Sequence, residues 1–183
     1  AGGNLAFAET KDWQGLNKVY TFNPFNETWT EQPDMRHGRW YPTTTTLPDG
    51  RVLIMSGRDE TGGDYATSRN KDIELFTPSS SLDGVGTITL VAVRGQSGMP
   101  PDGAYYPHVF VMPSGRALVA GPEVGDSWFV NSFGSGTSFS WADAPGETYR
   151  YFDTAVIVPG GTSGSTKVMQ IGGADNGAKA STT

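Results

Sequence analysis

Few side chains in this sequence could do redox, metal or acid–base chemistry, and Tyr41 comes first because it stands directly before a β-rich run. A phenol at the start of a strand can ligate a metal, or it can be a half-buried strand tyrosine with a satisfied hydroxyl. His37 and His108 are the only histidines, and two imidazoles would suit a transition metal. We expect His37 in a connecting loop and His108 before a strand of a different repeat, which favours structural or surface roles for both.

Acidic side chains gather in two loops. Asp59, Glu60 and Asp64 could chelate calcium or act as a carboxylate pair, but their spacing fits no EF-hand loop. That mismatch favours a solvated acidic loop. Glu123 and Asp126 could flank a scissile glycosidic bond, which keeps a glycosidase as an alternative.

Tryptophan rings offer another kind of site, because they can stack on sugar rings. The sequence has five of them: Trp13, Trp29, Trp40, Trp128 and Trp141. Trp29 and Trp141 are expected on the outer strands of repeats, where one repeat packs against the next. We therefore assign these two to the core.

Composition limits the class of protein. Glycine and proline supply 25 and 12 of the 183 residues, a density that suits many short strands and argues against long helices. The net charge of −6 argues against a nucleic-acid partner or an anionic membrane surface. The absence of cysteine excludes disulfides and thiol catalysis. No stretch is apolar enough for a membrane span, and residues 1–20 lack the form of a signal peptide.

A turn followed by an apolar strand that ends in glycine recurs along the chain. The first copy is 47–57, in which Pro48-Asp49-Gly50 forms a tight turn. Similar copies occupy 112–121 and 158–173, and residues 1–3 look like the end of another. The glycines that end these copies are 54, 64 and 52 residues apart, and periods near 50 are typical of kelch-type propeller blades.

The sequence therefore predicts an all-β fold, a kelch-type β-propeller with four-stranded antiparallel blades, of which three to four are represented as a partial ring. The blade segments are 1–35 (end of one blade), 36–95 (second), 104–145 (third) and 150–183 (start of the fourth). Outer strands are expected at 18–22, 28–31, 73–76, 87–93, 127–130 and 138–141. Because blades bury their faces against neighbours, the expected partner is the rest of the propeller or another copy of the chain.

Three motifs carry a family resemblance: Arg39-Trp40-Tyr41-Pro42-Thr43, the following Leu47-Pro48-Asp49-Gly50-Arg51-Val52, and Tyr106-Pro107-His108 leading to Ala120-Gly121-Pro122. In this order they resemble the propeller domain of the galactose oxidase and glyoxal oxidase family, which are secreted copper radical oxidases. The resemblance implies a mononuclear copper held by two tyrosines and two histidines, one tyrosine being linked to a cysteine and carrying a radical. It also implies oxidation of a primary alcohol or an aldehyde by dioxygen, with hydrogen peroxide as product, and an extracellular location.

Within this resemblance, Tyr41 matches the cross-linked tyrosine, which makes it the candidate catalytic residue and copper ligand. The cysteine–tyrosine cross-link is not possible within this chain, because it has no cysteine. The partner cysteine is expected before Ala1, and the second tyrosine and the histidine ligands are expected after Thr183, so residues outside the chain would complete the site. The segment alone is therefore expected to be inactive.

Some members of the family stack a tryptophan on the radical from the loop that follows the second strand of the blade. The corresponding loop here, 58–64, contains no tryptophan. Either another residue supplies the shielding, or the radical is tuned differently, or there is no radical.

Loops 58–64, 122–126 and 174–177 each follow the second strand of a blade and are expected at the mouth of the site. The substrate-side candidates are Arg58, Asp59, Glu60, Tyr106, Glu123, Asp175 and Asn176. The expected substrate is a small alcohol or aldehyde, or a carbohydrate. The alternative is a galactose-oxidase-like kelch propeller without catalysis, acting as a carbohydrate-binding, protein-binding or structural module.

Overall fold

The computed structural model describes residues 1–4, 14–62, 67–92, 105–121, 127–130, 141–143, 153–158, 160, 166–175 and 179–180. Within these ranges the regular structure consists of β-strands, with no helix, and this confirms the predicted all-β class. The chain forms two compact units, Ala1–Met99 and Pro100–Thr183.

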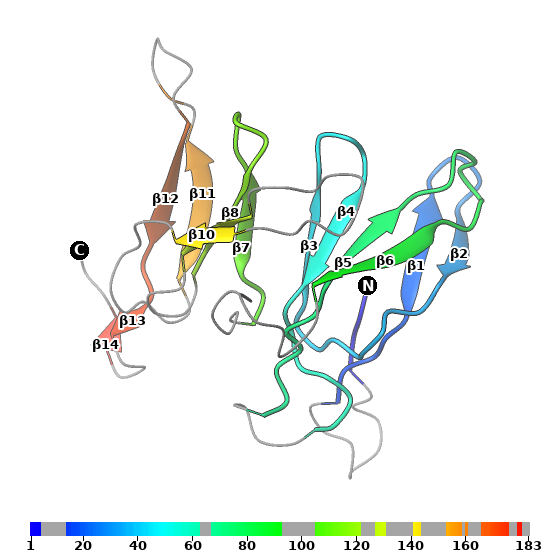
Figure 1. Ribbon diagram of the computed structural model, residues 1–183, viewed down its shortest axis with the longest axis horizontal. Coiled ribbons are helices and arrows are strands. Elements are labelled where there is room, and N and C mark those ends of the chain that lie inside the picture. Colours follow the sequence, from blue (N-terminus) through cyan, green and yellow to red (C-terminus); the bar gives the residue numbers. More distant parts are fainter. Residues whose placement is uncertain are drawn as a thin grey trace. The chain divides into compact units, whose positions relative to one another are not determined.

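The first unit contains a two-stranded hairpin and a four-stranded sheet (Figure 1). The hairpin consists of β1 (Val19–Asn23) and β2 (Thr28–Gln32). The sheet is an antiparallel meander of β3 (Thr43–Thr46), β4 (Val52–Met55), β5 (Ile73–Thr77) and β6 (Thr87–Ala92), in that order. The predicted four-stranded antiparallel sheet is thus present, and its strand order is that of a propeller blade.

The β3–β4 turn forms as its residue types predict. The Leu47 amide donates to the Arg51 carbonyl at 2.8 Å, and the Gly50 amide donates to the Leu47 carbonyl at 3.0 Å. Gly50 has a φ of 84°, a conformation that glycine adopts without steric strain. Asp49 closes the turn by accepting from the Arg51 amide at 3.1 Å. This turn sets the register in which Thr43 pairs with Met55 and Thr46 with Val52.

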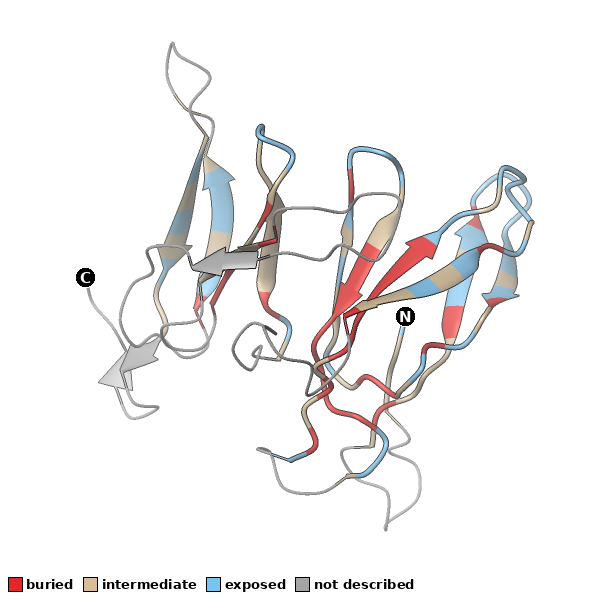
Figure 2. Ribbon diagram, viewed as in Figure 1, coloured by how far each residue is buried: buried red, intermediate tan, exposed pale blue. Residues whose placement is uncertain are grey.

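Strands β4 and β5 are buried on both faces (Figure 2), which explains the continuous apolar sequence of β4 and the apolar residues on both sides of Glu74 in β5. Directly paired residues lie on the same face, so Ile54 and Val52 share a face with Glu74 and Phe76 of β5. The core cluster on this face consists of Val19, Met35, Ile54 and Phe76, with Val52 and Ile88 packed against it. Glu74 is therefore a charged residue on the apolar face of the sheet.

The hairpin β1–β2 is attached to the sheet by polar contacts as well as by the core. The Gln32 side chain accepts from the Gly86 amide at 2.8 Å and donates to the Gly84 carbonyl at 3.3 Å. At the turn of the hairpin, Asn23 donates to the Asp83 carboxylate at 2.8 Å. These contacts fix one face of the hairpin against β5–β6.

The opposite face of the hairpin carries Tyr20, Phe22 and Trp29, all of them exposed. The ring centroids of Phe22 and Trp29 are 5.0 Å apart. The sequence predicted that Trp29 belongs to the core. This prediction is wrong, because Trp29 is 68% exposed in the first unit. Strand alternation explains the difference, because Trp29 lies on the face turned away from the β3–β6 sheet.

The second unit contains a four-stranded antiparallel sheet and two hairpins. The sheet consists of β7 (His108–Val111), β8 (Ala117–Ala120), β9 (Trp128–Val130) and β10 (Trp141–Asp143), which pair in chain order. The hairpins are β11 (Thr154–Val158) with β12 (Lys167–Ile171), and β13 (Ala174–Asp175) with β14 (Lys179–Ala180). The last of these hairpins was not expected from the sequence.

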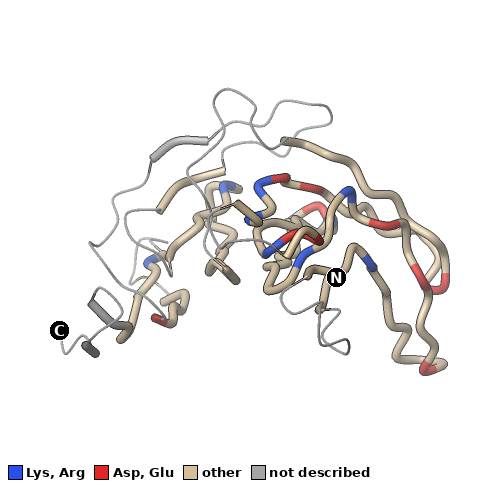
Figure 3. Tube along the Cα trace, turned by 90° about the horizontal axis from the view of Figure 1, so that it is seen from below, with Lys and Arg blue, Asp and Glu red and all other residues tan. Residues whose placement is uncertain are grey.

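Small and aromatic side chains fill the core of the second unit. Ala117, Val119, Trp128 and Val130 are buried on β8 and β9. The guanidinium of Arg116 lies 3.8 Å from the ring centroid of Phe129, a cation–π contact. Lys and Arg residues are interspersed with Asp and Glu along the described trace, as the scattered charges of the sequence predict (Figure 3).

Candidate functional site

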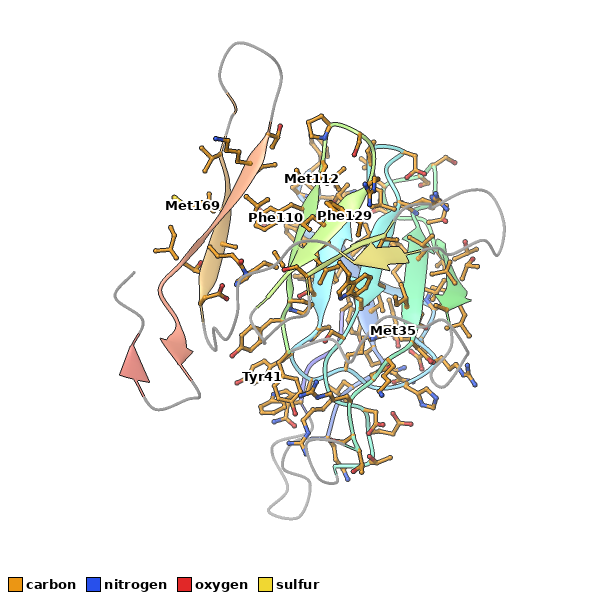
Figure 4. All side chains as sticks on the ribbon, turned by 60° about the vertical axis from the view of Figure 1, so that its left-hand side comes forward. Met35, Tyr41, Phe110, Met112, Phe129 and Met169 are labelled. Atoms are coloured by element: carbon orange, nitrogen blue, oxygen red, sulfur yellow. The ribbon has the colours of Figure 1, made fainter. Side chains whose placement is uncertain are left out.

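Tyr41 lies at the entrance to β3 in an unusual backbone conformation. Its φ is 62°, a value that a bulky residue adopts only where the surrounding structure imposes it. The side chain is 44% exposed and lies near the ends of the strands of its unit (Figure 4). The chain thus keeps a strained tyrosine accessible to solvent at the start of a blade strand.

The positive φ of Tyr41 places its ring against that of the preceding residue. In an extended strand, neighbouring side chains point to opposite faces. Here the ring centroids of Trp40 and Tyr41 are 4.0 Å apart and the ring planes differ by 26°, so the two rings are stacked. This stack could not be predicted from the motif alone, because it depends on the backbone conformation of Tyr41.

The antiparallel hairpin brings the loop after β4 beside this pair. Trp40 and Arg58 exchange backbone hydrogen bonds, each 2.8 Å long. Gly57 has a φ of 91°, and a Cβ atom there would lie 2.8 Å from the Trp40 carbonyl oxygen. Glycine therefore permits the close approach of the loop to the backbone that precedes Tyr41.

Glu60 connects this loop to the segment before Trp40. Its carboxylate lies 2.9 Å from His37 Nδ1 and accepts from the Gly38 amide at 2.8 Å. The pKa of the Glu60 carboxyl is lowered: partial burial opposes the shift, and the contacts with His37 and Gly38 outweigh it. His37 thus has a carboxylate partner that could not be predicted from sequence spacing, and its structural or surface role stays a prediction.

The neighbouring loop residues Arg58 and Asp59 are buried within the loop. Arg58 Nε donates to Ser68 Oγ at 2.9 Å, and Asp59 accepts from the Thr61 amide at 2.9 Å. Both side chains therefore stabilise the loop that faces Trp40. Their role toward a substrate stays a prediction.

The residue before Trp40 takes part in a buried ion pair that the sequence did not predict. Arg39 Nη2 lies 2.7 Å from Glu74 Oε2, and the side chains are 0% and 1% exposed. The guanidinium also donates to the carbonyl oxygens of Ser56 at 2.9 Å and Asp72 at 2.8 Å. Burial lowers the pKa of Arg39, and Glu74 opposes that shift.

Tyr106 occupies the corresponding place in the second unit. It precedes Pro107 and β7, has a φ of 38° and is 38% exposed. His108 Nε2 lies 3.3 Å from the carboxylate of Asp153, so this histidine also has a carboxylate neighbour. Glu123 and Asn176 lie outside the described residues, and only the backbone of Asp175 is described.

The described part of the chain does not form a complete metal site. No group of three or more histidine, aspartate or glutamate side chains there could hold a metal ion. The role of Tyr41 as a copper ligand stays a prediction. Among the same residues, no helix is long and apolar enough to cross a membrane.

Fold and site together define an all-β protein of four-stranded antiparallel meanders, with an accessible tyrosine held at a strand entrance. No family model matches the chain. It is similar to galactose oxidase from Gibberella zeae, with 28% identity over 123 residues, which is 65% of this chain and 17% of that protein. It is also similar to the aldehyde oxidase GLOX from Vitis pseudoreticulata, with 27% identity over 114 residues, 59% of this chain and 19% of the relative. The chain thus spans less than a fifth of the length of these curated relatives.

Proposed function

We propose that this chain is the central propeller segment of an extracellular copper radical oxidase of the galactose oxidase and glyoxal oxidase type. The similarity to two oxidases supports the class of reaction. The observation that carries the proposal is Tyr41 itself, an accessible phenol in a strained conformation beside the loop after β4. Strain of this kind is characteristic of functional sites.

In the proposed reaction a primary alcohol or an aldehyde hydrate loses two electrons and two protons, and dioxygen takes up both to form hydrogen peroxide. A bound copper ion would accept one of the electrons, and an oxidised Tyr41 would accept the other. A phenolate is also a suitable ligand for copper(II). Tyr41 would thus have two roles, as a ligand and as a one-electron acceptor.

Trp40 would supply the shielding that loop 58–64 lacks. Its indole covers one face of the Tyr41 ring at a centroid distance of 4.0 Å. An indole in this position limits the access of water to the phenol from that side. We assign to Trp40 the stacking role for which no tryptophan is found in the loop.

The remaining parts of the site would come from outside this chain. The cysteine of the cross-link, the second tyrosine and the histidine ligands have no counterpart among its residues at the matching positions. The segments 36–95 and 104–145 would be complete blades, with 1–35 and 150–183 belonging to their neighbours. The rest of the propeller, or another copy of the chain, would cover the blade faces.

The test is peroxide release by the full-length protein, as its gene encodes it, after loading with copper. Primary alcohols and small aldehydes are offered as substrates. Tyr41→Phe should abolish peroxide release. Tyr20→Phe is the matched control, because Tyr20 is similarly exposed, on β1, and it should leave the rate unchanged.

A copper-loaded protein that releases no peroxide from any of these substrates would contradict the oxidase. In that case the second candidate, a binding or structural module, would gain support. The exposed aromatic face formed by Tyr20, Phe22 and Trp29 is the observation that favours it.

A further inference from the structure

We propose that Glu74 is a positioning residue for Tyr41 and acts through the buried side chain of Arg39. The proposal rests on the proposed function only for the chemical role of Tyr41. Its structural content, a buried ion pair that fixes the conformation of the Trp40–Tyr41 segment, concerns residues of this chain alone.

Glu74 contacts two residues of the segment before Tyr41, Arg36 and Arg39. One carboxylate oxygen accepts from Arg39 Nη2 at 2.7 Å, and the other accepts from the backbone amide of Arg36 at 2.8 Å. The carboxylate thus binds both a side chain and the main chain of the segment that leads to Tyr41. Both contacts span more than thirty residues of sequence.

The same guanidinium connects this segment to the two central strands of the sheet. Arg39 donates to the Ser56 carbonyl directly after β4 and to the Asp72 carbonyl directly before β5. Its backbone is also bonded on both sides, because its amide donates to Leu16 and its carbonyl accepts from Gly3, each at 2.9 Å. Arg39 is therefore fixed in position two residues before Tyr41.

From Arg39 the constraint passes to Tyr41 through a single residue. Trp40 is held by its two backbone hydrogen bonds with Arg58. Pro42 by itself favours an extended conformation with negative φ for Tyr41, so the observed φ of 62° must be imposed by the fixed residues that precede Tyr41. The positive φ and the ring stack are the outcome of these constraints.

Stability alone does not account for a buried ion pair on an apolar face. Removing two charges from water costs more than their attraction commonly returns, and apolar residues of similar size are often at least as stabilising. Ile54 and Phe76 show that this face accepts such residues. The ladder between β5 and β6 is also irregular between Ile73 and Glu74, the kind of distortion that redirects a side chain.

The experiment separates positioning from stability with the double variant Arg39→Met/Glu74→Leu of the full-length protein. The readout is the near-ultraviolet circular dichroism of the Trp40–Tyr41 stack. It is isolated as the difference between each protein and the same protein carrying Tyr41→Phe. We expect the double variant to stay folded with a lower melting temperature, because apolar groups replace the ion pair but the hydrogen bonds of Arg39 to the Ser56 and Asp72 carbonyls, and of Glu74 to the Arg36 amide, are lost. We also expect it to lose most of the Tyr41 difference signal.

A folded double variant with the full Tyr41 signal would overturn the proposal. Should the double variant fail to fold, Glu74→Gln decides, because it keeps the size of the side chain and removes its charge. We expect Glu74→Gln to lower both the melting temperature and the Tyr41 signal, and a signal of wild-type strength in its native state would likewise overturn the proposal.

The matched control is Arg51→Met, which breaks an ion pair at the β3–β4 turn, where Arg51 lies 2.7 Å from the more exposed Asp49. It should leave the Tyr41 signal unchanged, and a loss there would show that the signal reports general loosening instead. The signal is measured without copper. A missing oxidase activity would therefore contradict the proposed function and leave the role of Glu74 standing. An unchanged Tyr41 signal in the Glu74 variants would overturn the role of Glu74 and leave the proposed function standing.

Discussion

The close approach of the loop after β4 to Trp40 predicts that a single methyl group at Gly57 is strongly destabilising. Gly57 and Gly50 both have a positive φ, 91° and 84°. They differ in their surroundings, because a Cβ at Gly50 would meet nothing within 4 Å. At Gly57 it would meet the Trp40 carbonyl oxygen at 2.8 Å and the Pro42 nitrogen at 3.2 Å. Alanine at the two positions thus separates backbone strain from steric contact.

The magnitudes follow from these two contributions. A positive φ in a non-glycine residue costs about 1–2 kcal/mol, and this is the whole expected effect of Gly50→Ala. At Gly57 the obstructing carbonyl also accepts from the Arg58 amide at 2.8 Å, so moving it weakens a hydrogen bond worth about 0.5–1.5 kcal/mol. With the residual overlap, we expect Gly57→Ala to cost roughly 2–4 kcal/mol.

Urea unfolding followed by tryptophan fluorescence measures both variants. With a denaturant dependence of roughly 2 kcal/mol/M, the midpoint should fall by about 1–2 M for Gly57→Ala and by about 0.5–1 M for Gly50→Ala. Equal shifts for the two variants would contradict this prediction, because they would show that the contact between a Cβ at position 57 and the Trp40 carbonyl contributes nothing to the free energy of unfolding. A change in the Tyr41 dichroism signal should accompany Gly57→Ala alone.

Two further predictions concern the attachment of the hairpin and the core. Hydrogen bonds from Asn23, Asn26 and Thr28 lower the pKa of Asp83 in the folded protein below its ordinary 3.8. The Asp83 carboxylate therefore contributes its full stabilisation above pH 3.8, and this stabilisation is lost as the pH falls through the folded pKa. Asp83→Asn should therefore flatten the dependence of the urea midpoint on pH between about pH 5 and pH 3, and an unchanged slope would contradict the role of Asp83. In the core, Phe76→Ala should lower the free energy of unfolding by about 3–5 kcal/mol and Ile54→Val by about 0.5–1.5 kcal/mol in the same assay. Similar small costs for both variants would contradict the burial of this cluster.

Local sequence signals were sufficient to predict most strands of the two sheets, although the last strand of the second sheet was expected at 138–141 and β10 lies at Trp141–Asp143. The Pro48-Asp49-Gly50 turn and the glycine-terminated copies placed β3, β4, β7 and β8, because turn geometry and strand alternation are short-range properties. The β11–β12 hairpin followed from the same pattern. Trp29 was misplaced because its residue type suggested burial, whereas its face of the hairpin is exposed.

The environment of Tyr41 could be predicted only in part. Its position before a strand was evident, but its backbone conformation and its stack on Trp40 involve long-range contacts, such as the backbone hydrogen bonds between Trp40 and Arg58, which local sequence patterns do not specify. Glu74 gave no signal, because a glutamate in a strand normally faces solvent. Its partner Arg39 lies 35 residues away, a separation at which no pattern of residue types specifies pairing.

The most direct test of the proposed radical site is the electron paramagnetic resonance spectrum of the full-length protein, first matured with copper, then stripped of the metal and oxidised, with the loss of a tyrosyl radical signal as the criterion. The metal is removed because a radical on a copper(II) ligand would couple to the metal spin and give no signal of its own. The two informative variants are Tyr41→Phe and Tyr106→Phe. Both tyrosines have a positive φ, both are followed by a proline, and both are exposed. We expect the radical to be lost in Tyr41→Phe and retained in Tyr106→Phe. A radical that persists in Tyr41→Phe would contradict it.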